Sequence, residues 1–390
     1  MTHNSLTTHQ QYMYRCLELA QLGAGYVAPN PMVGAVLVFE NRIIGEGYHQ
    51  QYGGPHAEVN CINSVHEKNK DLIPQSTLYV SLEPCSHFGK TPPCADLIIS
   101  CKIPQVVIGC SDPSKEVNGK GIEKLKAAGI KVVSGILEKE CQQLNKRFFT
   151  FHTQHRPYII LKWAETADNK IAGNGSDRLL ITNEQTNRLV HKWRSEESSI
   201  LIGTNTALSD DPELTTRNWI GPSPIRLVID MDLKLPSSLK IFNDKQRTVI
   251  FNTVKHIEEE SLYYYQVTED VNLVHQIVNA LYQMKILSVI VEGGARLLQS
   301  FIDEGIWDEM RIISSAALEI GSGLVAPRPE NAILVHNEEI LTDTIEIYQK
   351  GNSAEHINEP DDSHFRTHHK ADHNQCRRQI SEPFHPIHLE

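Results

Sequence analysis

Residues 77–94 read TLYVSLEPCSHFGKTPPC, and the tripeptide His56-Ala57-Glu58 lies upstream of them. The first six residues of the longer stretch are rich in β-favouring and apolar types, which predicts a buried strand. Pro84-Cys85 follows this strand directly, and Cys94 comes nine positions after Cys85. We expect His56 to begin one helix and the residues after Cys94 to form another. The histidine and both cysteines therefore lie at junctions between strands and helices.

These residue types predict a catalytic zinc site. Zinc favours a tetrahedral shell of nitrogen and sulfur ligands, and a catalytic site leaves one position open for water. One histidine and two cysteines leave that position open, and zinc brings the pKa of bound water close to neutrality. A carboxylate that is not a ligand can then carry protons during attack on an amino-bearing ring carbon. The pattern thus indicates a deaminase with ligands His56, Cys85 and Cys94 and with Glu58 as the catalytic proton carrier.

The surrounding sequence alternates between strand-like and helix-like segments, which is typical of an α/β fold. In the first part we expect strands at 34–39, 42–48, 77–82, 105–109 and 131–134, and helices at 12–22, 56–65, 95–100 and 121–128. A connecting helix is expected over 138–151. After it we expect strands at 157–162, 199–202, 225–229, 248–251, 288–291 and 309–313, and helices at 184–195 and 272–284.

This pattern divides the chain into residues 1–150, residues 156–350 and a tail at 351–390. The tail is rich in histidine and poor in apolar residues, so we expect it to be disordered.

Composition narrows the functional classes. Hydrophobic residues make up 40% of the 390 residues, enough for globular cores, and the formal net charge is −11. An acidic chain is a poor general binder of nucleic acid, because phosphate contacts need clustered Lys and Arg. No apolar run reaches the roughly 20 residues of a membrane span. We therefore expect a cytoplasmic protein that acts on a small molecule, with no nucleic-acid or membrane partner.

The ordered His/Cys/Cys set resembles the cytidine-deaminase-like superfamily. Nucleoside and transfer-RNA deaminases usually carry P-C-x-x-C, whereas here the stretch 86–93 separates the two cysteines. With Pro29-Asn30-Pro31 and Gly47-Tyr48-His49, this longer form resembles the deaminase half of the bifunctional riboflavin-biosynthesis deaminase/reductases. The resemblance implies a three-layer cytidine-deaminase-like domain at 1–150, with Asn30 and His49 at a pyrimidine nucleotide. The implied substrate is 2,5-diamino-6-(5-phosphoribosylamino)pyrimidin-4-one.

Residues 156–350 are less informative taken alone. They lack a G-x-G-x-x-G fingerprint, and the segment Val291-Glu292-Gly293-Gly294 fits either a phosphate-binding helix N-terminus or a simple strand-to-helix turn. By resemblance they form a dihydrofolate-reductase-like domain that uses NADPH to reduce the ribosyl group to ribityl.

The resemblance also implies roles for particular residues of this half. Lys162 and Asp210 would polarise or protonate the opened sugar. Arg194 and Arg217 would bind the substrate phosphate, because guanidinium forks match phosphate oxygens. The implied substrate residues are Arg194, Leu214, Arg217 and Glu292, and the implied cofactor residues are Ala164, Thr206, Asp210, Gly294, Ala295, Arg296 and Leu297. Three positions depart from the family pattern, namely Asn169, Arg178 and Leu180, and no family role is transferred to the last two. Family members commonly associate, which implies a homodimer or a higher oligomer.

Two other classes of protein are compatible with a zinc site. A nucleic-acid-editing deaminase would carry closely spaced cysteines and a basic face, and the acidic charge and the long spacing weigh against it. A zinc-stabilised structural protein would close the metal shell with a fourth ligand, for instance Cys61 or His87.

Overall fold

The computed structural model describes residues 7–88, 92–115, 117–175 and 179–351. Arg178 and residues 352–390, which include nearly all of the expected tail, lie outside the described residues. Within the described ranges, no helix combines the length and apolarity needed to cross a membrane.

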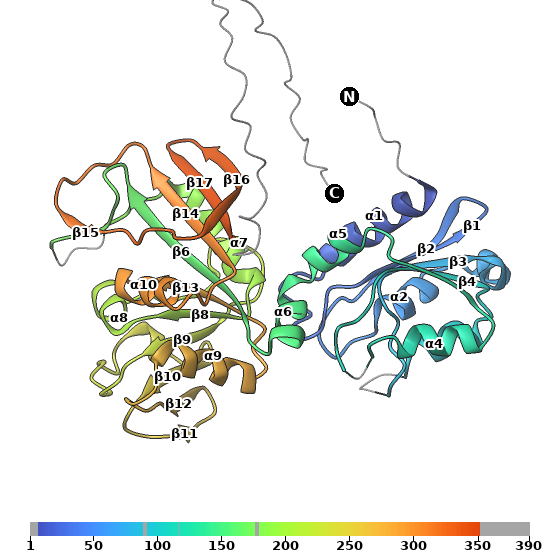
Figure 1. Ribbon diagram of the computed structural model, residues 1–390, viewed down its shortest axis with the longest axis horizontal. Coiled ribbons are helices and arrows are strands. Elements are labelled where there is room, and N and C mark those ends of the chain that lie inside the picture. The colour runs from blue at the N-terminus through green and yellow to red at the C-terminus, as the bar shows by residue number, and fades with distance from the viewer. Residues whose placement is uncertain (1–6, 89–91, 116, 176–178, 352–390) are drawn as a thin grey trace, which may run out of the picture. The chain divides into compact units, whose positions relative to one another are not determined.

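The first domain is built on a five-stranded mixed sheet with the order β2-β1-β3-β4-β5 (Figure 1). Strands β1 and β2 pair antiparallel, β1 also pairs antiparallel with β3, and β3, β4 and β5 run parallel. The five strands are β1 (Gly34–Phe39), β2 (Arg42–Tyr48), β3 (Thr77–Leu82), β4 (Gln105–Cys110) and β5 (Lys131–Ser134). Because β3 and β4 are parallel neighbours, the loops that leave them emerge at the same edge of the sheet.

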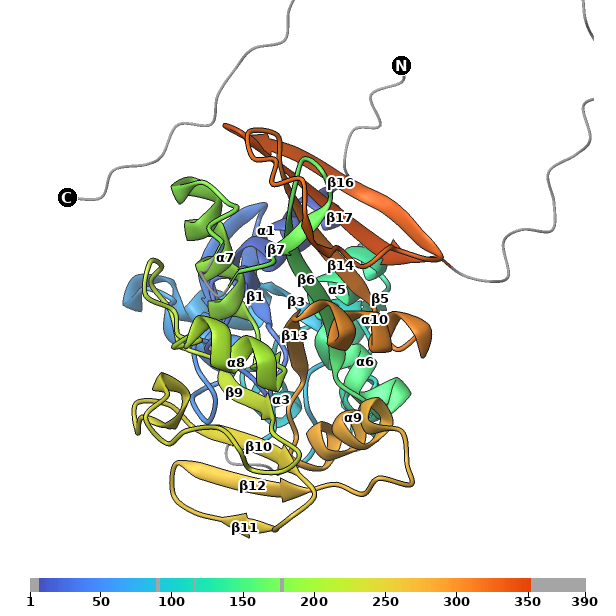
Figure 2. The ribbon, with the colours of Figure 1, turned by 90° about the vertical axis from the view of Figure 1, so that its left-hand side faces the viewer.

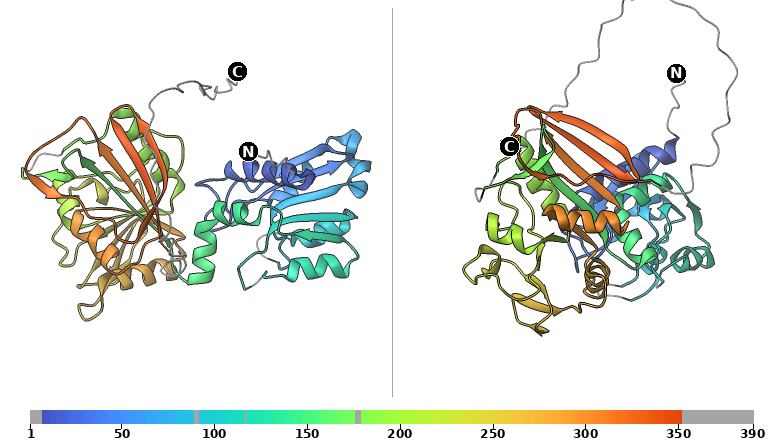
Figure 3. Two further views of the ribbon diagram at one scale, coloured as in Figure 1. Left: turned by 45° about the horizontal axis from the view of Figure 1, so that its top comes forward. Right: turned by 60° about the vertical axis from the view of Figure 1, so that its left-hand side comes forward.

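Helices cover both faces of this sheet, as the left view of Figure 3 shows. On one face α1 (Thr8–Gln21) and α5 (Glu138–Leu144) bury Met13, Cys16 and Cys141 against β1, β3 and β4. The other face is covered by α2 (Ala57–Asn63), α3 (Cys94–Ser100) and α4 (Lys120–Ala127). The 3₁₀ helix η1 (Glu67–Gln75) leads into β3. The expected three-layer α/β domain is therefore confirmed.

The expected connecting helix is two helices. It breaks at Asn145, and α6 (Lys146–Gln154) follows α5 directly. The Asn145 side chain explains the break, because it bonds the backbone of Met32 in both directions. Its Oδ1 accepts from the Met32 N–H at 2.8 Å, and its Nδ2 donates to the Met32 carbonyl at 2.9 Å. These bonds to a loop far away in the sequence fix the bend at Asn145, and local helical periodicity does not reveal it.

The second domain is built on a ten-stranded sheet with the order β11-β12-β10-β9-β8-β13-β6-β14-β17-β16, which Figure 2 shows along its length. The seven strands from β12 to β14 are parallel. They are β12 (Leu262–Gln266), β10 (Thr248–Asn252), β9 (Ile225–Ile229), β8 (Ser199–Ile202), β13 (Ser288–Gly293), β6 (Tyr158–Thr166) and β14 (Glu309–Ser315). Antiparallel edges are formed by β11 (Ile257–Glu258), β17 (Asp343–Lys350) and β16 (Ala332–Ile340).

Helices cover both faces of this sheet as well. On one face α9 (Leu273–Gln283) and α10 (Ala295–Asp303) bury Ile277, Leu281 and Phe301 against the central strands. The opposite face carries α7 (Glu184–Glu196) and α8 (Thr204–Asp210). The remaining elements are the ribbon of β7 (Lys170–Gly173) with β15 (Gly323–Val325) and the 3₁₀ helix η2 (Lys240–Phe242).

The strands that the sequence did not indicate are exposed or only half-buried for most of their length. In β16 every residue between its two ends is exposed, and β11 is exposed throughout. Such strands lack the apolar run or alternation that marks a buried strand. The buried strands β8 and β9, in contrast, have the bounds that their apolar runs predict.

Helix α6 is held to the second domain by buried ion pairs. The guanidinium of Arg147 donates to both carboxylate oxygens of Glu197, whose side chain has no exposed area, and Arg311 lies 3.5 Å from the same carboxylate. Burial raises the pKa of Glu197, but the positive charges of Arg147 and Arg311 outweigh this effect and lower it.

We expect Glu197→Gln to reduce the free energy of unfolding by about 3 kcal/mol, because it leaves the guanidinium of Arg147 without its counter-charge, whereas Arg311 keeps its pair with Glu309. Denaturant unfolding monitored by circular dichroism measures this change. The matched control is Glu196→Gln, which breaks a surface pair with Lys192 and should cost less than about 1 kcal/mol. Equal losses of unfolding free energy in the two variants would contradict the stabilising role of the buried Glu197 ion pair.

Two candidate active sites

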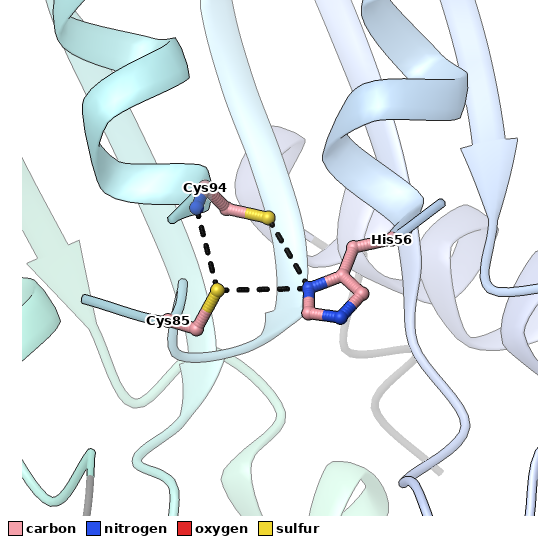
Figure 4. Close-up of side chains that lie close together, drawn as sticks. All are labelled: His56, Cys85 and Cys94. Carbon is pink, nitrogen blue, oxygen red and sulfur yellow. Dashed lines mark hydrogen bonds between the residues drawn. The ribbon is translucent and has the colours of Figure 1, made fainter. Parts of the chain in front are cut away.

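Three metal-ligand side chains converge at one edge of the first sheet (Figure 4). His56 is the N-cap of α2, Cys85 lies in the loop after β3, and Cys94 is the first residue of α3. The Nδ1 atom of His56 lies 3.6 Å from Sγ of Cys85 and 3.4 Å from Sγ of Cys94. The loop is held against α3 by backbone bonds, because the Cys94 N–H donates to the Cys85 sulfur and the Ala95 N–H to the Cys85 carbonyl.

This geometry fits a zinc ion. With Zn–S near 2.3 Å and Zn–N near 2.0 Å, tetrahedral angles place a sulfur and a nitrogen ligand about 3.5 Å apart. Both His56-to-cysteine distances agree with that separation. A hydrogen bond from Cys94 and then the neighbouring His56 also lower the pKa of Cys85 to about 4, which favours the thiolate form that binds metal.

Within the described residues, the cluster contains these three donors and no fourth. Cys61, one of the two candidates for closing the shell, is fully buried and its thiol donates to the Gly45 carbonyl at 3.4 Å. His87 lines the neighbouring cavity without joining the cluster. The donor set is therefore that of an open site, as a catalytic metal requires.

Glu58 lies in the first turn of α2 and has 3% of its surface exposed. Burial, followed by the negative charge expected on Cys85, raises the pKa of Glu58. The side chain lines the cavity beside the three donors. A buried carboxyl with a raised pKa is suited to accept and return a proton.

The expected substrate residues Asn30 and His49 are brought together. The Nδ1 atom of His49 lies 3.0 Å from the Pro55 carbonyl, so Nδ1 carries the hydrogen. Burial lowers the pKa of His49, which favours the neutral ring. Its Nε2 atom must then accept from the Asn30 amide nitrogen at 3.0 Å. The hydrogen bond from Nδ2 of Asn30 to His49 thus fixes the orientation of the Asn30 side chain.

The same cavity, about 550 Å³ in volume, is lined by residues that the sequence analysis did not assign. Asp112, Ser114 and Val117 follow β4, and Tyr52 follows β2. Burial raises the pKa of Asp112, whose Oδ1 accepts from the Ser114 N–H at 2.8 Å. The signal was the position of Asp112 after a buried strand parallel to the Cys85 strand, since such strands deliver their loops to one edge.

A second cavity, about 1100 Å³ in volume, lies in the second domain at the carboxyl ends of β6, β8 and β13. All seven expected cofactor residues line it, as do Lys162, Arg194, Leu214 and Glu292. The starts of α8 and α10 border it through Thr204 and Ala295. The start of α10 presents backbone N–H groups suited to phosphate, and this cavity is large enough for a dinucleotide beside a nucleotide.

Within this cavity Arg194 is already paired. Its Nε and Nη2 atoms donate to the two carboxylate oxygens of Glu292 at 3.0 and 2.7 Å. Burial raises the pKa of Glu292, but Arg194 and then Lys162 outweigh this effect and lower it to about 2. Glu292 is therefore anionic at neutral pH and links the two cations.

The structure does not place Arg217 among the residues that line this cavity. Its guanidinium bonds Glu213 at 3.2 Å and Thr215 at 3.4 Å, and nearly half of its side chain is exposed. Of the positions that depart from the family pattern, Leu180 lines the cavity with 74% of its surface exposed. Asn169 adopts a left-handed conformation in the turn before β7.

Two family models match the two halves of the chain. Residues 6–110 match the model of the cytidine and deoxycytidylate deaminase zinc-binding region, and residues 157–331 match that of the RibD C-terminal domain.

Relatives align over most of the chain. The riboflavin biosynthesis protein RibD of Aquifex aeolicus is 42% identical over 321 residues, which cover 81% of this chain and 88% of the relative. The RibD protein of Escherichia coli is 36% identical and covers 80% and 89%.

A solved structure matches both domains. The diaminohydroxyphosphoribosylaminopyrimidine deaminase/5-amino-6-(5-phosphoribosylamino)uracil reductase of Thermotoga maritima has a TM-score of 0.79 and 37% identity. The match covers 88% of this chain and 99% of that one. With a zinc-binding deaminase domain and a reductase domain in one chain, this protein belongs to the RibD family of bifunctional riboflavin-biosynthesis enzymes.

Proposed function

We propose that this chain acts on the two substrates after which the Thermotoga maritima deaminase/reductase is named. Its first domain would hydrolytically deaminate 2,5-diamino-6-(5-phosphoribosylamino)pyrimidin-4-one. Its second domain would then use NADPH to reduce the ribosyl group of the resulting aminouracil to ribityl. The observation that carries the proposal is the open His56, Cys85 and Cys94 cluster beside a buried carboxyl, with a nucleotide-sized cavity around it.

In the deaminase site, His56, Cys85 and Cys94 would hold zinc, which makes water a nucleophile near neutral pH. Glu58 would take a proton from the water and deliver it to the leaving amino group, so that the ring gains an oxygen and ammonia departs. Asn30 and His49 would orient the pyrimidine, supported by their mutual hydrogen bond and the fixed His49 tautomer. Asp112 and Ser114 would complete the pocket.

In the reductase site, bound NADPH would supply a hydride for the sugar carbon attached to the base nitrogen, and a residue of this chain would deliver a proton to the heteroatom bonded to that carbon. Lys162 is the favoured donor, since it is a cation near the anionic Glu292 in the cavity. Asp210 at the end of α8 is the second candidate. The start of α10, from Gly294 to Leu297, would hold a cofactor phosphate, with Ala164 and Thr206 lining the same cavity.

Arg194 would hold Glu292 in place, and Arg217 would reach the substrate phosphate only after leaving Glu213. Leu214 also lines this cavity and is 2% exposed. A cytoplasmic location and self-association stay predictions from the sequence, as do the domain limits at 1–150 and 156–350.

Removing Glu58 tests the deaminase half. We expect Glu58→Gln to lower the kcat of ammonia release about 100- to 10,000-fold, because it removes the proton carrier. Zinc content by atomic absorption should stay at the wild-type value. NADPH oxidation with 5-amino-6-(5-phosphoribosylamino)uracil supplied directly should also be unchanged. Ammonia release within a few-fold of wild type would refute this role for Glu58.

Zinc removal separates the two halves. Dialysis against a strong chelator should abolish ammonia release and leave NADPH oxidation on the aminouracil intact, because the second cavity has no metal-ligand cluster among its described residues. Added Zn²⁺ should restore deamination. If Cys85→Ser retained full zinc content and full deaminase activity, the assignment of this ligand would be wrong.

Lys162→Met tests the reductase half. We expect NADPH oxidation on the aminouracil to fall about 100-fold or more, since general-acid assistance is lost, while ammonia release is unchanged. The control is Lys234→Met, which removes an exposed lysine paired with Asp232 and should leave both activities intact. If Lys162→Met had no effect and Asp210→Asn abolished reduction, the proton donor would be Asp210 instead.

A further inference from the structure

A buried carboxylate lies two residues before the zinc ligand Cys85. Glu83 follows β3 directly and has 4% of its surface exposed. Its backbone N–H donates to the Cys110 carbonyl at 3.0 Å, which continues the pairing of β3 with β4. A buried carboxyl group needs hydrogen-bond donors, because leaving it unpaired away from water is costly.

Four backbone N–H groups donate to this carboxyl group. Oε2 accepts from Gly119 at 3.0 Å and from Asp112 at 3.3 Å. Oε1 accepts from Gly121 at 3.0 Å and from Ile122 at 3.3 Å. Each carboxyl oxygen thus accepts two backbone hydrogen bonds, so this one side chain constrains four positions of the backbone.

One of the four donors, Asp112, lines the deaminase cavity, and the other three lie at the start of α4 and just before it. One oxygen holds both Asp112, at the start of the turn that follows β4, and Gly119, at its end. Between them, Ser114 and Val117 line the cavity together with Asp112. The other oxygen holds the first turn of α4, whose N-cap Gly119 has no side chain to bond these N–H groups. Glu83 therefore serves as the cap of α4 from a different strand.

The contact between α4 and the zinc-ligand loop is unusually close. A Cβ atom at Gly121 would lie 2.0 Å from the Pro84 carbonyl oxygen and 3.2 Å from Oε1 of Glu83. The backbone of α4 at Gly121 therefore packs directly against Pro84, the residue that precedes Cys85. A displacement of the turn that follows β4 would change its distance from the metal ligands.

We propose that Glu83 is a positioning residue for deamination, which fixes the cavity wall formed by Asp112, Ser114 and Val117 at a set distance from the zinc ligand Cys85. Glu83 itself acts only through these residues. The wall holds the pyrimidine, whereas Glu58 and the three metal ligands perform the chemistry. Losing Glu83 should therefore weaken substrate binding more than it slows turnover.

The direct test is Glu83→Gln in the full-length enzyme. The amide is isosteric but directs an NH₂ group at two backbone N–H donors. We expect the KM of ammonia release to rise about tenfold or more, with kcat lowered less than about threefold. Zinc content and NADPH oxidation on the supplied aminouracil should match the wild type, since neither depends on this wall.

A matched pair of glycine variants tests the same idea without changing the carboxylate. Gly119 and Gly129 lie at opposite ends of α4, with φ of +86° and +81°, and a Cβ at either would meet nothing within 4 Å. Alanine should therefore impose similar backbone strain at both. Only Gly119 is bonded to Glu83, so we expect Gly119→Ala to raise KM about three- to tenfold and Gly129→Ala to leave it unchanged.

The outcomes separate positioning from general stability. If Glu83→Gln lowers the melting temperature while the zinc-loaded enzyme keeps its wild-type KM, Glu83 is only a structural cap and the proposal is overturned. Equal KM values for Gly119→Ala and Gly129→Ala overturn it as well. The glycine pair decides the question even if Glu83→Gln does not fold.

Discussion

The deaminase half depends on the convergence of three donor atoms at one edge of a sheet. His56 and Cys94 each begin a helix on the same face of the sheet, and Cys85 leaves β3 between them. Their separations of 3.4 and 3.6 Å match the edges of a tetrahedral zinc shell. Because the donors come from three separate segments, the site exists only when β3, α2 and α3 are packed together. The buried contacts of Ala57, Ala95 and Ile98 thus serve the chemistry as well as stability.

Around that centre, a small number of polar side chains hold loops that have no regular structure of their own. Asn145 holds the Met32 backbone, His49 holds Asn30, and Glu83 holds the residues after β4. Each bond is buried or partly buried, where an unpaired polar group would be costly. This arrangement explains how a cavity lined by loops can be pre-organised for a small polar nucleotide.

In the second domain, charged side chains rather than metal ligands are brought together at the end of a strand. Glu292 is buried, yet the cations Arg194 and Lys162 keep it ionised. Glu292 therefore stabilises positive charge on Arg194 and Lys162. Helix α10 begins three residues after Glu292, so this charged cluster and the start of α10 are both positioned by the end of β13.

The sequence by itself predicted the three donor side chains that the structure brings together, the buried carboxyl group of Glu58 beside them and most buried strands. Apolar runs such as Gly34–Phe39 and Ser199–Ile202 mark strands because the central strands of a sheet are buried on both faces. The spacing of Cys85 and Cys94, by resemblance, selected the family. Exposed strands such as β16, the break at Asn145, the pairing of Arg194 with Glu292 and the role of Glu83 were decided by tertiary structure. Strand β16 pairs with the adjacent β17 but lacks a buried face that would mark it as a strand. The other three features depend on contacts between residues far apart in the chain, and no local pattern of polarity records which distant partner a side chain will meet.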